Sequence, residues 1–281
     1  MTSPSSSVQE ARQALGKRLA DIRLAAGITK RELAKRCGWH ESKASRFERG
    51  TRAPSERDLR AWCAACGAQS QAEDLISTAR GIEGMYVEWR DMEANGLKLA
   101  QESVVPLWER TERFHIYSPW LIPGPVQTAS YITALLTSLR DRRGIIDDVP
   151  AAVKVRVEKQ QVVYGKHTFA IILEESVLRT RIGGTDVMAG QLGYLLSAMA
   201  LPSISIGIIP QDADRSGLWP VEGFFLHDDE LVNVELISAH LTIVQRHELA
   251  MYAKTFAELA ELAVTGAAAR ELITAAIESL G

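Results

Sequence analysis

The sequence is poor in aromatic residues, which make up 6% of its 281 positions, and it contains only three cysteines. It has no window of about eighteen consecutive apolar residues, the length that a membrane-spanning helix requires. The first residues, MTSPSSSVQEARQ, have neither the basic start nor the apolar core of a secretory signal. We therefore expect a cytoplasmic protein with no membrane partner.

The motifs of the common enzyme classes are also missing from the sequence, which has no GxSxG, HExxH, P-loop or GxGxxG. The best acid and base candidates are Glu174-Glu175 and His227-Asp228-Asp229. Neither group belongs to a recognisable catalytic constellation, and acidic turns are usually only solvated turns. We therefore predict a protein that is not an enzyme and that needs no cofactor.

Two of the cysteines, Cys63 and Cys66, form a CAAC motif. The chain has no second CxxC and no nearby histidine cluster, so a four-ligand zinc site lacks ligands. Both cysteines share a predicted helix with Leu59 and Trp62, and free cysteine is a common small buried residue. We predict a structural role for them and no metal site, with a redox pair as the alternative.

Charge is divided unevenly along the chain. Residues 1–80 hold 15 Lys and Arg against 9 Asp and Glu, a net charge of +6, whereas the remaining 201 residues hold 17 against 26, a net charge of −9. A basic module joined to an acidic one indicates that a polyanion binds at one end only.

Residues 28–49, ITKRELAKRCGWHESKASRFER, have the pattern of a helix-turn-helix. Gly38 falls where a tight turn between two helices needs a left-handed backbone. A second short helix over residues 41–49 then presents serine, lysine and arginine outward, as a helix that reads the major groove requires. The residues that we expect to face inward are Leu33, Ala34, Ala44 and Phe47.

The outward residues of this motif fall into two predicted groups. Arginine and lysine suit the O6 and N7 atoms of guanine, so base contacts are expected from Ser42, Lys43 and Arg46, with Glu41 a weaker candidate. Contacts to phosphates are expected from Lys30, Arg31, Arg49 and Arg52. For each residue, the alternative is a solvated charge without a partner.

Residues 15–80 resemble the Cro/cI-type, or XRE, family of bacterial repressor domains. The segments that carry the resemblance are TKRELAKRCGW and SKASRFERGTRAPS. The chain departs from the family at His40, where serine or threonine is usual, and at Lys30, where glutamine is usual. The resemblance implies five short helices, the third of which lies in the major groove.

A second domain follows, and its elements are of mixed type. Residues 168–173 and 204–209 are typical of strands, and an apolar helix expected over residues 190–200 would make the two strands parallel. Residues 223–227 and 230–236 indicate a hairpin around an Asp-Asp turn. Residues 153–164 fit a helix, although their valines leave a strand open, and residues 242–280 are helical with a break near 265. We predict an α/β domain with a small mixed sheet of about four strands, beside an N-terminal all-α domain of the lambda-repressor-like helix-turn-helix type.

Aromatic residues gather in a segment punctuated by prolines, which we interpret as a loop that holds Phe114, Tyr117 and Trp120. Such a loop either packs on the core or forms a pocket or partner-docking surface. A closed ligand cavity would use Phe114 and Trp120 together with Trp219 and Phe224.

Seven segments in order resemble the C-terminal domain of actinobacterial XRE regulators with a DUF5753 domain, including WhiJ-like proteins. These segments are FHIYSPWLIPGPVQTASYI, VRVEKQQVV, ILEESVLR, QLGYLL, ISIGIIP, VNVEL and FAELAELA. The resemblance implies a transcriptional regulator that is modulated by a small acidic protein encoded nearby, in an antitoxin-like arrangement.

Together these patterns predict a regulator, most simply a repressor, that binds an inverted repeat in double-stranded DNA as a homodimer. The alternatives are a small-molecule sensor with a ligand pocket in its C-terminal domain, and a module that only bridges proteins. We expect a disordered tail over residues 1–10, a DNA-binding domain over 11–80, a helical connector over 81–113 and a regulatory or partner domain over 114–281.

Overall fold

The computed structural model describes residues 4–84 and 86–281, and the chain divides into two compact units, residues 1–87 and residues 88–281. Each unit is described by itself. No helix in the described part of the chain is both long and apolar enough to span a bilayer.

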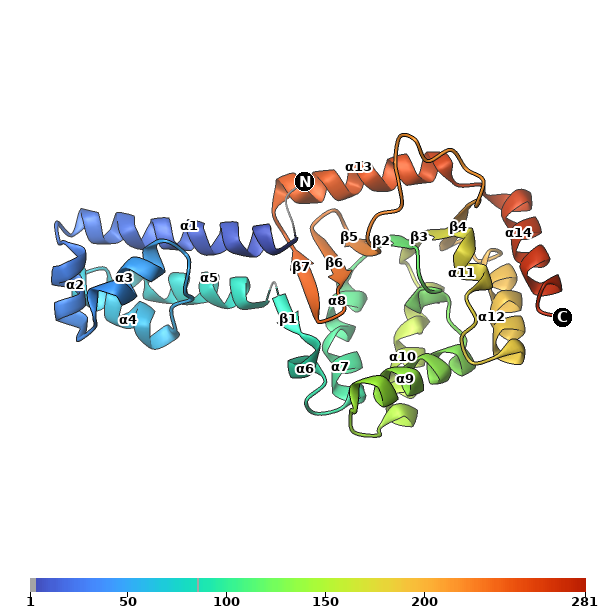
Figure 1. The fold of residues 1–281 in the computed structure, drawn as a ribbon, viewed down its shortest axis with the longest axis horizontal. Coiled ribbons are helices and arrows are strands. Elements are labelled where there is room, and N and C mark those ends of the chain that lie inside the picture. The colour runs from blue at the N-terminus through green and yellow to red at the C-terminus, as the bar shows by residue number, and fades with distance from the viewer. Residues whose placement is uncertain (1–3, 85) are drawn as a thin grey trace. The chain divides into compact units, whose positions relative to one another are not determined.

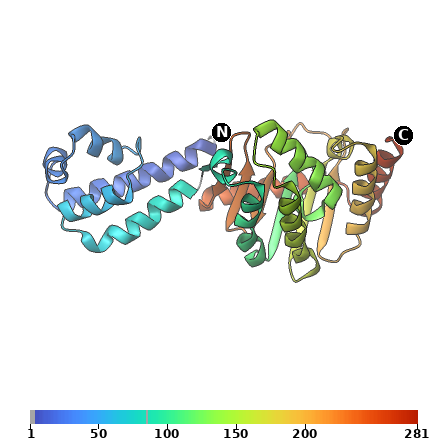
Figure 2. The same cartoon turned by 90° about the horizontal axis from the view of Figure 1, so that it is seen from below.

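Residues 4–84 of the first unit form helices and their connecting loops, and the expected five α-helices are present (Figure 1). Helices α1 and α5 lie side by side, as Figure 2 also shows. The elements are α1 (Pro4–Ala25), α2 (Lys30–Cys37), α3 (Glu41–Glu48), α4 (Glu56–Ala65), the short 3-10 helix η1 (Gln69–Gln71) and α5 (Ala72–Gly84).

The disordered tail expected over residues 1–10 differs from the structure, because α1 already begins at Pro4. Proline is tolerated in the first turn of a helix, where its missing N–H would have had no partner. The amide of Gln9 then donates to the carbonyl of Gly50 at 3.4 Å, which ties this end of α1 to the loop after α3. Residues 1–3 of the expected tail lie outside the described residues.

The core of the first unit contains the residues that the helical periodicity predicts, among them the fully buried Leu19, Leu33 and Trp62. The indole N–H of Trp62 donates to the carbonyl of Leu19 at 3.1 Å. Cys63 is buried in the same core, and burial raises the pKa of the Cys66 thiol to about 11. Such a thiol is a poor nucleophile at neutral pH.

The second unit is an α/β fold around a mixed sheet of seven strands in the order β1-β7-β6-β5-β2-β3-β4. Strand β2 pairs in parallel with β3, and β3 with β4, while β2–β5, β5–β6 and β6–β7 are antiparallel. The strands are β1 (Tyr86–Glu88), β2 (Arg113–Ser118), β3 (Thr168–Glu174), β4 (Ile204–Ile209), β5 (Phe224–His227), β6 (Leu231–Glu235) and β7 (Ala239–Ile243).

Helices cover both faces of this sheet (Figure 1). Phe256 of α13 stacks on His115 of β2, with the ring centroids 4.8 Å apart. On the opposite face of the same strand, the ring centroids of Trp108 of α8 and Phe114 are 5.4 Å apart. The helical elements are α6 (Trp89–Met92), α7 (Leu97–Ser103), α8 (Val105–Arg110), η2 (Gly124–Val126), α9 (Ala129–Arg143), α10 (Val149–Lys159), η3 (Gln160–Tyr164), α11 (Glu175–Arg179), α12 (Thr185–Ala198), α13 (Arg246–Leu262) and α14 (Gly266–Glu278).

Several local predictions for this unit are confirmed. Strands β3 and β4 are parallel and are joined through α12, and β5 and β6 form the expected hairpin. Asp228 and Asp229 both adopt positive φ angles, 52° and 61°, in the hairpin turn. The Asp228 carboxylate accepts hydrogen bonds from the backbone N–H groups of Glu112 and Arg113, so this acidic turn has a structural role.

The expected number of about four strands was too low, and two segments were assigned wrongly. Residues 113–118, interpreted as an aromatic loop, form β2, which is paired on both sides and therefore lies inside the sheet. The expected helical connector over residues 81–113 contains β1 as well as α6, α7 and α8, and from residue 88 onward it belongs to the second unit. The segment left open over residues 153–164 is helical.

Candidate nucleic-acid interface

The turn between α2 and α3 has the predicted geometry. Gly38 adopts the left-handed conformation, with φ at 69°, and the N–H of Trp39 donates to the carbonyl of Ala34 at 2.8 Å. His40 serves as the N-cap of α3, since its ring Nδ1 accepts the N–H of Ser42 at 3.3 Å. An imidazole therefore fills the capping role for which serine or threonine is usual.

Helix α3 is held from beneath by apolar packing and by one buried carboxylate. Ala44 and Phe47 are buried, and the Phe47 ring packs edge-on against Trp39 at 5.8 Å. The Glu48 carboxylate accepts a hydrogen bond from Nε of Arg23 at 2.5 Å and lies 3.0 Å from Nζ of Lys30. Because Arg23 lies on α1 and Lys30 on α2, this carboxylate ties three helices together and fixes the direction of α3.

The outer face of α3 presents Glu41, Ser42, Arg46 and Arg49, all of which are exposed. The Nε of Arg46 donates to the carbonyl of Ser42 at 3.2 Å, and the Nε of Arg49 donates to the carbonyl of Ser45 at 3.3 Å. Within the described residues, the terminal nitrogens of both guanidinium groups have no carboxylate partner. They remain available to a ligand in solvent.

Lys43 differs from these residues, because it is half-buried and already has partners. Its Nζ lies 2.6 Å from the Asp58 carboxylate of α4 and 4.5 Å from the centre of the Trp39 ring. Burial alone would raise the pKa of Asp58, but hydrogen bonds from Lys43 and Ser55 outweigh it and hold that pKa below its usual value. No local sequence pattern indicates this ion pair, whose members are fifteen residues apart.

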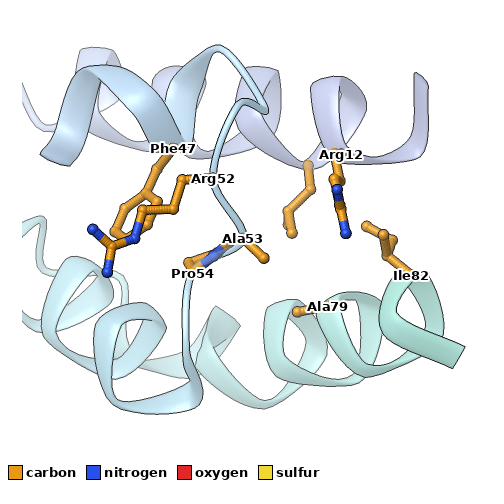
Figure 3. Close-up of a pocket in the computed structure, with 8 residues that line it drawn as sticks. Arg12, Phe47, Arg52, Ala53, Pro54, Ala79 and Ile82 are labelled. Carbon is orange, nitrogen blue, oxygen red and sulfur yellow. The ribbon is translucent and has the colours of Figure 1, made fainter. Parts of the chain in front are cut away.

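The four residues expected at phosphates are not equivalent. Lys30 is committed to the buried Glu48, whereas Arg31 is exposed at the start of α2. Arg52 is exposed in the loop after α3 and borders a small hollow whose lining is mostly apolar (Figure 3). This hollow is lined by Arg12, Leu15, Phe47, Arg52, Ala53, Pro54, Ala79 and Ile82.

The five aromatic candidates of the second unit do not form one pocket. Phe114, Tyr117 and Phe224 are no more than 1% exposed, whereas Trp120 and Trp219 are 65% and 55% exposed. Tyr117 and Phe224 are paired on one face of the sheet, and Phe114 lies on the other face, stacked on Phe169 at 4.4 Å. A closed cavity lined by Phe114, Phe224 and both tryptophans is therefore not formed.

The acidic pair at the end of β3 is occupied by contacts within the unit. Tyr117 donates its hydroxyl to Glu174 at 2.6 Å, and the guanidinium of Arg215 lies 3.1 Å from the same carboxylate. Glu175 accepts the N–H of Gln211 and pairs with Arg179. In the described part of the chain, no group of three His, Cys, Asp or Glu residues is arranged to hold a metal ion.

Comparisons with known proteins agree with this division of the chain. Residues 14–75 match a family model described as a helix-turn-helix domain, and residues 102–275 match the model of a domain of unknown function, DUF5753. None of the curated proteins matches the chain. Among solved structures, TrmBL2, described as an archaeal chromatin protein with a novel mode of DNA binding, aligns with 75% of this chain and 70% of its own at 11% identity and a TM-score of 0.34. A similarity this weak carries no argument about function.

Proposed function

Because the chain belongs to the DUF5753 family and also carries a helix-turn-helix domain, we propose that it is a transcriptional regulator that reads a specific DNA sequence through α3. The observation that carries the proposal is the outer face of α3. Ser42 and Arg46 are exposed there, one turn apart, on a helix whose direction is fixed by the buried Glu48. A rigid helix that presents exposed hydrogen-bonding side chains is what recognition in the major groove requires, and here the Ser42 hydroxyl also lies 2.9 Å from Nδ1 of His40.

We assign roles to the individual residues by whether their side chains already have partners within the unit. Arg46 is the main base reader, because its terminal nitrogens can bond the O6 and N7 of guanine, and Ser42 and Glu41 adjoin it. Arg31, Arg49 and Arg52 contact phosphates and set the register of the helix on the duplex. Lys30 and Lys43 support these contacts less directly, since both are engaged with carboxylates of their own unit.

We further propose that the protein acts as a homodimer and represses transcription. Two copies of α3 would enter successive major grooves, about 34 Å apart, so the operator would be an inverted repeat. The second unit would receive the regulatory signal, from a small acidic protein encoded nearby. The exposed indoles of Trp120 and Trp219 support this role, because tryptophan is enriched among the residues that dominate protein interfaces.

The test is selection of bound fragments from genomic DNA by the purified full-length chain at about 0.15 M salt, where binding to phosphates alone is weak. We expect one inverted-repeat motif, and we expect Arg46→Ala to lose it. Arg36→Ala is the matched control, because Arg36 is an exposed arginine that is paired with Glu32 and bonded to the carbonyl of Ala65. Failure to recover any motif, with or without extract of the host cells, would contradict the proposal.

A further inference from the structure

Helix α10 carries two cations, one turn apart, that form no ion pair within the described part of the chain. Lys159 is only 9% exposed, and Nε of Arg156 is fully buried without a hydrogen-bond partner. Neither side chain makes an ion pair or a hydrogen bond with any residue that the structure describes.

Other cations in this unit that are largely covered do have carboxylate partners. Arg143 pairs with the buried Glu93 at 2.5 Å, and Arg215 lies 3.1 Å from Glu174. Burying like charges without such partners is unfavourable, because the interior solvates charge poorly. Accordingly, burial and the neighbouring Arg156 lower the pKa of Lys159 to about 7.

The two cations lie beside an aromatic ring and a loop whose position is fixed by hydrogen bonds. The Lys159 ammonium lies 4.3 Å from the centre of the Trp108 ring. The buried loop of η2 passes close to Trp108 and Arg156 at Gly124. A Cβ at this position would lie 3.4 Å from the Trp108 ring and 3.8 Å from Nη2 of Arg156. The loop is itself fixed, because Gln160 donates to the carbonyls of Gly124 and Gln127.

Two polar side chains lie on the sheet face on the same side as Trp108. The ring centroids of Trp108 and Phe225 of β5 are 6.4 Å apart. The pairing of β5 with β6, and of β6 with β7, places Asn233 and Thr242 beside Phe225 on that face. Asn233 is only 9% exposed, and its amide donates to the Thr242 hydroxyl at 3.2 Å. Glu235, farther along β6, affects both cations electrostatically but forms an ion pair with neither. This region therefore combines two cationic side chains that have no ion-pair partner among the described residues, an aromatic ring and fixed polar groups.

We propose that Arg156 and Lys159 form the binding site of a small organic anion, whose carboxylate or phosphate group they neutralise and whose body packs against Trp108. An anion there would supply the missing counter-charge, and an arginine beside a lysine is well suited to either acidic group. The inference goes beyond the proposed function, since it assigns a small-molecule ligand site to the second unit whether or not α3 binds DNA.

The experiment is titration of the full-length protein with inorganic phosphate and, separately, with citrate, followed by calorimetry and by the thermal unfolding midpoint. We expect saturable binding of one anion per chain and a rise of the midpoint by several degrees. The phosphate and citrate arms distinguish a phosphorylated ligand from a carboxylic acid. Lys159→Met and Arg156→Met should each lower the affinity at least tenfold and should still fold, because each removes an unpaired buried charge.

Two controls separate this site from other anion effects. Lys154→Met removes an exposed lysine of the same helix, 77% exposed at its side chain, and should leave anion binding unchanged. Lys254→Met removes an equally exposed lysine of α13, 77% exposed at its side chain, and should also bind the anion as the wild type does. Equal midpoint shifts in the wild type and in the Lys159 and Arg156 variants would mean a general salt effect only and would overturn the proposal. Absence of saturable binding of either anion would overturn it as well.

A measurement on the wild type keeps the proposal testable if a variant does not fold. The indole N–H of Trp108 should shift in the NMR spectrum as phosphate or citrate is added, whereas those of Trp39 and Trp62 in the first unit should not. A titration that moves the first-unit indoles and leaves Trp108 unchanged would place the anion elsewhere.

Discussion

The ammonium of Lys43 lies 2.6 Å from the carboxylate of Asp58, so an ion pair joins the candidate recognition helix α3 to α4. The two side chains are 24% and 13% exposed, and Asp58 also accepts the backbone N–H of Ser55 at the start of α4. One carboxylate thus restrains a lysine of the proposed recognition helix, and the same carboxylate caps the next helix. Lys43 is therefore the member of the outward set whose contribution to DNA binding depends most on its own neighbours.

Removing the charge of Asp58 should release Lys43. We expect Asp58→Asn to lower the free energy of unfolding by about 1 kcal/mol, since a partly buried charged hydrogen bond is lost while the cap is kept. The freed Lys43 should add about one phosphate contact, which steepens the dependence of DNA affinity on salt. The control is Glu73→Gln, which breaks the exposed pair with Arg60 and should leave the free energy of unfolding almost unchanged. An unchanged salt dependence would show that Lys43 does not reach the DNA.

Breaking the buried Glu48 cluster should destabilise the first unit far more. Glu48→Gln leaves Arg23, whose side chain is 9% exposed, without its charged partner. Loss of one partner of a buried pair typically costs about 3–5 kcal/mol, and we expect the lower end of that range because Arg23 also bonds the carbonyl of Ile28. Urea unfolding followed by tryptophan fluorescence measures the loss. Glu41→Gln, an exposed change on the same helix, should have almost no effect on stability.

Gly50 and Gly67 share a left-handed backbone conformation, but only Gly50 lies close to another segment of the chain. Substituting each in turn distinguishes the cost of backbone strain from the cost of a steric clash. Gly50 and Gly67 have φ angles of 67° and 69°, but a Cβ at Gly50 would lie 2.7 Å from the backbone nitrogen of Gln13, whereas one at Gly67 would meet nothing within 4 Å. Gly67→Ala should therefore cost about 1 kcal/mol from the left-handed backbone alone. Gly50→Ala should cost clearly more, because α1 must move away from the loop. Equal losses in the unfolding free energy would show that α1 does not pack on this loop.

The helix-turn-helix could be predicted from the sequence because its signals are local. Gly38 marks the turn, and the spacing of Ala44 and Phe47 marks the inward face of α3. The partners of Glu48 and Lys43 could not be predicted in this way. Arg23 and Asp58 lie 25 and 15 residues from them, and an exposed ion pair and a buried one look alike in sequence. Whether Arg46 is unpaired and Lys43 is paired therefore depends on the tertiary fold and not on the local sequence.

The second unit was predicted less completely for a related reason. Strand β2 is short, rich in aromatic residues and followed by Pro119, which is also the pattern of a surface loop. It becomes a strand through its partners β3 and β5, which are reached only after long stretches of intervening chain. Phe114 and Tyr117 were singled out as neighbours in a loop, but the alternation of a strand sends them to opposite faces. Strands β3 and β4, which are continuous apolar runs, were predicted almost to the residue.

The buried His227 should make the second unit sensitive to acid. Burial lowers its pKa to about 4, with smaller effects from its hydrogen-bonding and charged neighbours, whereas an unfolded histidine titrates near 6.5. Between these values the unfolded state binds more protons than the folded state, so stability rises with pH through this window and falls as the pH drops toward 4. Urea unfolding at pH 7 and pH 5 measures the change. His227→Gln should reduce the pH dependence, and an undiminished dependence would assign it to other groups.

Arg46 and Arg49 allow base reading to be told apart from phosphate binding on one helix. Both are exposed, and both donate Nε to a carbonyl four residues earlier, so the two alanine variants remove similar structural contacts. Arg46→Ala should weaken specific binding by about 1–3 kcal/mol and relax the preference at one base position. Arg49→Ala should weaken binding to all sequences alike and reduce the salt slope by about one. Affinities measured on the selected operator, on single-base variants and at several salt concentrations decide between these roles. If Arg46→Ala reduced the affinity for every sequence equally, Arg46 would be a phosphate contact, and the reading of bases would have to come from Ser42 or Glu41.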